Sequence, residues 1–215
     1  MAIRDLLWAC PLCGTVGGLA RARGGDACRA CGASFRRAGG SAIQARMPDG
    51  RVQTRPSAEW AAALPPEPPP AADPDPAGRA GGERFWRRDR VLARFALGDE
   101  PIRLGGEFLG TMERLGPKRP GALTLTAEAL DLRLDDGEVH RWPLEELSAL
   151  QASGGTVQVR PRGQPIVSFA FPESSARLWE ESIAAALRAR WRGLGRGEIA
   201  EFQPRIVGRP ARMTR

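Results

Sequence analysis

The chain has 215 residues, which suits one medium domain or one small and one medium domain, and its formal net charge is +7. Apart from Lys118, every Lys or Arg position is arginine, and Ala, Gly and Pro are frequent, which indicates a GC-rich, bacterial genome. Because such a genome favours arginine codons, the positive net charge is weak evidence for an anionic ligand. No apolar run approaches the ~18 residues of a membrane span, and the opening "MAIRDLLWAC" carries Asp5 in a short apolar run unlike that of a signal peptide. These features exclude a transmembrane segment and favour a cytoplasmic protein, with peripheral membrane association left open.

The positive charge lies at the two ends of the chain. Residues 1–47 have a net charge of +5 and residues 188–215 a net charge of +6, whereas residues 83–172 hold 13 basic and 13 acidic residues. Basic ends attract polyanions, so nucleic acid is one partner class that the sequence leaves open.

All four cysteines lie in two short motifs, "CPLCG" at 10–14 and "CRACG" at 28–32. Each C-x-x-C turn brings two thiolates to one point, and two facing turns supply a sulfur tetrahedron, which suits Zn²⁺. We therefore predict one zinc ion held by Cys10, Cys13, Cys28 and Cys31. Because the protein fills all four coordination positions, the predicted zinc is structural and not catalytic.

Two other interpretations of the cysteines are weaker. A redox pair needs one C-x-x-C beside a βαβ unit, and this sequence has two pairs and no such unit. Iron also accepts four thiolates, but zinc is the commoner structural occupant. The motifs and their spacing resemble the zinc-ribbon family over roughly residues 8–47, where a short apolar core would depend on the metal.

The elements after the cysteines lead into a linker. Residues 42–55 read as a hairpin whose turn is Pro48-Asp49-Gly50, and residues 57–64 as a short helix with Ser57 as N-cap, stopped by Pro65. The Pro-rich stretch 65–82 has few backbone donors and favours extended geometry, so it predicts a semi-rigid spacer.

Beyond the linker the pattern changes to short strands and one helix. Period-two alternation and tight turns predict antiparallel strands, and the 3.6-residue spacing around Trp179 predicts an amphipathic helix capped by Ser174 or Ser175 and ended by Gly193 and Gly195. The predicted strands are 106–115, 121–126, 129–134, 138–142, 156–160 and 166–171.

This order of elements resembles the PH/GRAM-like superfold. The stretch "GALTLTAEALDLRL" is similar to a GRAM-type strand pair, "WPLEELSAL" is similar to the segment that follows it, and Trp179 lies where the closing helix of such domains carries its tryptophan. The resemblance implies an α+β, mostly antiparallel β fold, in which a small zinc ribbon and a Pro-rich linker precede a PH/GRAM-like barrel closed by a C-terminal helix.

The predicted division of the chain has four parts. A zinc ribbon with a short hairpin occupies 1–56, a short helix and linker 57–82, a PH/GRAM-like domain 83–193, and a basic tail 194–215. Nothing in the sequence indicates the oligomeric state.

The resemblance also implies a class of ligand, since such domains bind phosphoinositides, other lipids or protein peptides. Arg114, Lys118 and Arg119 lie in the loop where lipid-binding members place basic residues, so they are candidate contacts for an anionic ligand. The loop lacks the spaced basic arrangement that clamps phosphates on two strands, so a solvated turn is favoured over a head-group site. A protein-binding role for the module is at least as well supported as a lipid-binding one.

No catalytic constellation stands out in the sequence. His140 is the one histidine, and nucleophile-elbow, phosphate-loop and metalloprotease motifs are absent. We therefore expect a non-enzymatic, zinc-binding interaction or adaptor protein that recruits a protein partner or an anionic lipid surface. The alternatives are a nucleic-acid-binding zinc-ribbon protein and an accessory component of a lipid-modifying system.

Overall fold

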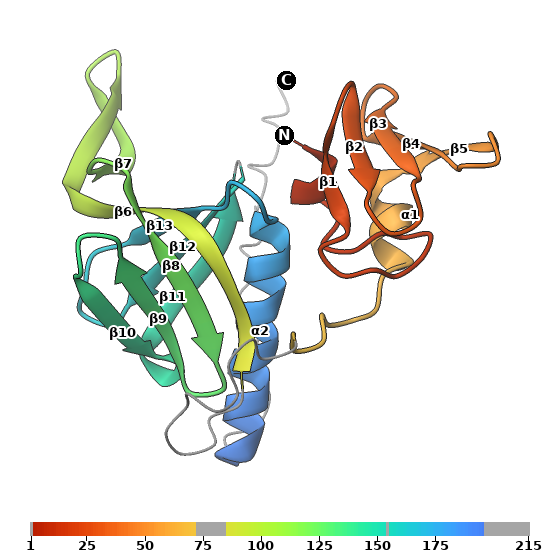
Figure 1. The fold of residues 1–215 in the computed structure, drawn as a ribbon. Helices are drawn as coiled ribbons and strands as arrows, with labels where there is room; N and C mark the ends of the chain where they lie inside the picture. The colour runs from red at the N-terminus through yellow and green to blue at the C-terminus, as the bar shows by residue number, and fades with distance from the viewer. Residues whose placement is uncertain (1, 72–84, 154, 196–215) are drawn as a thin grey trace, which may run out of the picture.

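The computed structural model describes residues 2–71, 85–153 and 155–195, which form two β-rich modules (Figure 1). The predicted linker lies partly, and the basic tail almost wholly, outside the described residues. In the N-terminal module five strands form an antiparallel meander in sequence order. Its elements are η1 (Ile3–Asp5), β1 (Leu19–Ala22), β2 (Gly25–Cys28), β3 (Ser34–Arg37), β4 (Ala42–Arg46), β5 (Val52–Pro56) and α1 (Ser57–Ala62).

The short helix α1 closes the core of the N-terminal module. The Trp60 ring is buried, meets Phe35 edge-on at 6.3 Å between ring centroids, and donates its indole N–H to the Ile43 carbonyl at 3.0 Å. The predicted helix is therefore present, but Ser57 is not its N-cap: Pro56 takes that position, and no side chain caps the helix. The predicted 42–55 hairpin is confirmed as β4 and β5, with Gly50 at a φ of 86° in its turn.

The C-terminal module is an eight-stranded antiparallel sheet with one long helix, so the predicted α+β, mostly antiparallel class is confirmed. The strand order is β10-β9-β8-β6-β13-β12-β11, with β7 paired to β6. The elements are β6 (Phe85–Leu104), β7 (Glu107–Leu115), β8 (Arg119–Thr126), β9 (Ala129–Leu134), β10 (Val139–Pro143), η4 (Leu144–Glu146), β11 (Leu147–Ser153), β12 (Thr156–Pro161), β13 (Val167–Ala170) and α2 (Ala176–Gly193).

The sheet does not close into the expected barrel. In the part of the chain that the structure describes, β10 and β11 are the two outer strands of the sheet, and no ladder joins them. The chain passes from one to the other through the short helical turn η4, which follows Pro143. Helix α2 contacts η4, β11 and β12, so a helix covers the part of the core that barrel closure would have covered.

Helix α2 is held on the sheet by Trp179. This side chain is fully buried, stacks on Phe171 with 5.1 Å between ring centroids, and donates its indole N–H to Asp89 at 2.7 Å. The Ser175 hydroxyl accepts the Leu178 N–H at 3.2 Å, which confirms one of the two predicted caps.

The two modules touch along the N-terminal end of α2. Leu178 is buried against Trp8 and Ala9 of the N-terminal module, and a Cβ added to Gly17 would lie 3.3 Å from the Leu178 side chain. The Ser175 hydroxyl donates to the Arg4 carbonyl. The N-terminal module is therefore packed on the helix that completes the C-terminal core, which the linker pattern did not predict.

None of the helices among the described residues combines the length and apolar character needed to cross a membrane.

Candidate metal centre

The two cysteine motifs form two knuckles with the same backbone geometry. In the first, the Cys10 N–H bonds the Thr15 carbonyl at 3.0 Å and the Gly14 N–H bonds the Cys10 carbonyl at 2.8 Å. In the second, the Cys28 N–H bonds the Ala33 carbonyl at 2.8 Å and the Gly32 N–H bonds the Cys28 carbonyl at 2.9 Å. Gly14 and Gly32 both have φ of 73°, a left-handed conformation that glycine adopts without steric cost.

The knuckles bring the four predicted ligands together. The Sγ atoms of Cys10 and Cys31 are 3.8 Å apart, those of Cys13 and Cys28 are 3.6 Å apart, and all four lie within 4.8 Å of one another. A tetrahedron with metal–sulfur bonds of about 2.3 Å has sulfur–sulfur edges of about 3.8 Å. The four thiols are therefore positioned to bind one metal ion, and their spacing fits zinc.

The environments of the thiols differ. Burial raises the pKa of the Cys10 thiol, and burial also raises the pKa of Cys31. The Thr15 hydroxyl, 3.2 Å from the exposed Cys13 sulfur, instead lowers the pKa of Cys13 to about 6. Because a metal takes thiolates, Cys13 is ready to bind at neutral pH, whereas binding to Cys10 and Cys31 must release protons.

A buried carboxylate fixes the chain just before the first knuckle. Asp26 on β2 is 2% exposed and accepts the backbone N–H groups of Ile3 at 2.7 Å and Arg4 at 3.2 Å. Sequence reasoning treated Asp26 only as a charge. No local pattern in the sequence shows that this carboxylate binds the chain terminus more than twenty residues away.

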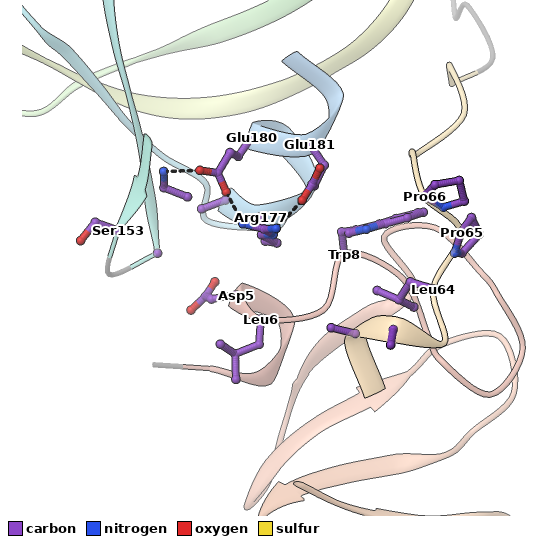
Figure 2. Close-up of a pocket in the computed structure, with 15 residues that line it drawn as sticks. Asp5, Leu6, Trp8, Leu64, Pro65, Pro66, Ser153, Arg177, Glu180 and Glu181 are labelled. Carbon is purple, nitrogen blue, oxygen red and sulfur yellow. Dashed lines mark hydrogen bonds and ion pairs between the residues drawn. The ribbon is translucent and has the colours of Figure 1, made fainter. Parts of the chain in front are cut away.

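A groove of about 640 Å³ lies where the two modules meet (Figure 2). The N-terminal side contributes mainly apolar groups, with Trp8 and Leu64 facing Pro65 and Pro66. Helix α2 contributes charged groups. Arg177 bonds Glu180 at 2.7 Å and also pairs with Glu181, while the Glu180 carboxylate accepts the Ala152 N–H at 2.8 Å.

The three residues predicted to contact an anionic ligand do not form a cluster of free positive charge. Arg119 on β8 pairs with Asp136 at 2.5 Å and with Glu138 at 2.6 Å. Arg114 on β7 lies 3.7 Å from Glu100, and Lys118 is exposed between the two strands. Two of the three cations thus already face carboxylates of this chain.

Comparison with known proteins leaves the family open: no protein-family model matches the chain, and no curated protein sequence matches it.

Proposed function

We propose that this protein is a non-enzymatic interaction protein, in which a zinc ribbon and a PH/GRAM-like module together bind a protein partner. The ribbon assignment is supported by the paired knuckles and by sulfur spacings that fit zinc. The PH/GRAM-like assignment is supported by the strand order. Leaving aside the β7 hairpin, the strands form two meanders, β6-β8-β9-β10 and β11-β12-β13, the last strand β13 lies beside the first strand β6, and a helix follows.

The single observation that carries the proposal is the groove between the modules. Its walls come from both modules and from the start of the linker, so it exists only when the two modules are packed together. Apolar walls suit protein side chains. The carboxylates of Asp5, Glu180 and Glu181 outnumber the one guanidinium of Arg177, which Glu180 and Glu181 already share. The partner that fits is a protein segment with apolar and basic side chains.

Two neighbouring alanines at the C-terminal end of α1 test the groove. Ala62 lines it and is exposed, so Ala62→Arg fills the groove with bulk and positive charge without disturbing a core. Ala63 is also exposed but does not line the groove, so Ala63→Arg is the matched control. In affinity purification with quantitative mass spectrometry, we expect Ala62→Arg to lose at least about tenfold of the partner that the wild type and Ala63→Arg retain. Equal recovery by both variants, with unchanged melting temperatures, would remove the groove from the account.

A membrane surface fits the observations less well than a protein. Arg119 and Arg114 face carboxylates of the same chain, so a phosphate would have to compete with existing ion pairs. The role as an accessory component of a lipid-modifying system rests on the resemblance alone and stays a prediction.

Nucleic acid is a second candidate because of one feature of the N-terminal module. A hollow of about 200 Å³ on its sheet is lined by Arg23, Arg36 and Arg46, all exposed. Guanidinium groups around a hollow suit backbone phosphates.

If the hollow binds phosphates, its arginines should contribute to polyanion binding. Replacing Arg36 and Arg46 by alanine should weaken binding of single-stranded RNA and lower the salt slope by about 1.4. Arg51 and Arg55 are exposed on the same module outside the hollow, so their alanine double variant is the control. Fluorescence anisotropy across a salt series measures both variants. Identical slopes for the two would mean that the arginines act only as diffuse charge.

A further inference from the structure

A two-stranded arm projects from the C-terminal module. It comprises residues 97–115, the far half of β6 and all of β7, and it rises away from the sheet (Figure 1). Among the described residues, β7 pairs only with β6, and β6 beyond Ala96 pairs only with β7. Both edges of the arm thus present backbone N–H and C=O groups that no ladder within the described chain uses.

The arm is also the most apolar part of the exposed surface. Of the nine large hydrophobic side chains that are exposed in the described residues, six lie on it. They are Leu97, Ile102, Leu104, Phe108, Leu109 and Met112, between 42% and 72% exposed. An isolated two-stranded hairpin is marginally stable in water. An exposed apolar patch of this size is typical of an interaction surface, so we expect the arm to bind a partner.

The apolar side chains lie on both faces of the arm. Ile102 and Leu104 share one face because alternate residues of a strand do, whereas Phe108 pairs with Arg103 and therefore lies on the other. A partner packed on one face would leave the other uncovered. Pairing along the β7 edge instead brings the β7 side chains of both faces beside those of a neighbouring strand.

The charges on the arm argue against insertion into lipid. Glu107 follows the tip glycines Gly105 and Gly106 directly, so burying Leu104 and Phe108 in a bilayer would carry a carboxylate with them. Near the base of the arm, Glu113 pairs with Arg160 at 3.3 Å and Glu100 lies 3.7 Å from Arg114. Residues 97–115 carry four acidic side chains and two arginines, so with Arg160 included the net charge of the arm is −1 and two arms repel each other only weakly.

We propose that β7 pairs edge to edge with β7 of a second copy of this chain, about a two-fold axis, to form a dimer. An antiparallel edge is complementary to its own copy under such an axis. Of the six apolar side chains, Phe108, Leu109 and Met112 lie on β7 itself. At on the order of 100 Å² exposed each, they give the pairing edge roughly 300 Å² per copy beside its backbone hydrogen bonds, which is the size of a weak, concentration-dependent interface. This dimer does not depend on the groove or on the metal.

The test is the oligomeric state of the full-length protein, measured by sedimentation velocity from low to high micromolar concentration. We expect a monomer–dimer equilibrium that Phe108→Glu with Leu109→Glu weakens at least about tenfold. The control is Val139→Glu: Val139 is 56% exposed on β10, an outer strand of the sheet, so it matches the exposure of Phe108 but lies off the arm. Hydrogen exchange adds a second readout, because dimerisation through β7 should slow exchange of amides 107–115 as concentration rises.

Three results would overturn the proposal. The first is a wild-type protein that stays monomeric over the whole concentration range. The second is a dimer that resists the arm substitutions or is lost with Val139→Glu, which would place the interface elsewhere. The third is a monomer that sediments with liposomes only when Phe108 and Leu109 are intact, which would assign the arm to a membrane.

Discussion

Replacing Cys13 by serine is expected to unfold the N-terminal module and to leave the C-terminal module folded but less stable. The N-terminal core is small, and two of its buried side chains, Cys10 and Cys28, belong to the four thiols positioned to bind the metal. Zinc binding of this kind contributes on the order of 10 kcal/mol that is coupled to folding. Removing one thiolate should abolish most of this binding free energy, and the remaining apolar side chains are too few to stabilise the module without it.

The loss should reach the C-terminal module through the junction. The first knuckle lies between Trp8 and Gly17, and the Gly17 N–H donates a hydrogen bond to the Trp8 carbonyl at 3.0 Å. Trp8 in turn packs on Leu178. When the knuckle opens, Leu178 becomes exposed, at a cost of about 2 kcal/mol. The C-terminal module keeps its own separate core of buried residues, so it should still unfold cooperatively, several degrees lower.

Calorimetry and amide NMR of the full-length protein measure both effects. Cys13→Ser should lose the dispersed signals of residues 8–47 and shift the remaining transition downward. Thr15→Ala is the matched control, because it removes the hydroxyl next to the Cys13 sulfur but keeps all four ligands. Dispersed signals for residues 8–47 in Cys13→Ser would show that the module folds without a complete metal site.

Replacing Trp179 by alanine is expected to be the most damaging change in the C-terminal module. The side chain is fully buried, stacked on Phe171 and bonded to Asp89, so its loss leaves both a cavity and a partly unpaired carboxylate. Truncation of this kind costs about 3–5 kcal/mol, which lowers the melting temperature of such a module by roughly 12 °C or more.

Two further variants separate the contributions of Trp179. Trp179→Phe keeps an aromatic ring against Phe171 but loses the bond to Asp89, so it should fall between the wild type and alanine. Arg192→Ala, on the exposed last turn of α2, should change the melting temperature by less than about 2 °C. Equal destabilisation by Trp179→Ala and Arg192→Ala would contradict the packing of α2 on the sheet.

The metal ligands could be predicted because their signal is local. Four cysteines at this spacing specify two knuckles with little help from the rest of the chain, and the structure brings all four together. The same holds for hairpins such as β8–β9, whose alternation and turn are contiguous, and for α2, whose apolar stripe and Ser175 cap are explicit in the sequence.

The features that sequence reasoning missed depend on contacts between distant segments. Strand β6 mixes arginines with apolar residues and contains Gly98 and Pro101, yet it forms because β8 and β13 pair with its first half. Trp8 lies within the stretch that resembles a zinc ribbon, but it packs on Leu178, far along the chain. The sheet is open between β10 and β11, where the chain turns through η4, and no periodic pattern in the sequence shows such a corner.

The metal content of the full-length protein, purified without chelators, tests the zinc site most directly. Inductively coupled plasma mass spectrometry should find one zinc ion per chain, bound by the thiolates of Cys10, Cys13, Cys28 and Cys31, which lie within 4.8 Å of one another. Removing that zinc with a strong chelator should abolish the dispersed amide signals of residues 8–47. A protein that contains no metal as purified and still shows those signals would contradict the account.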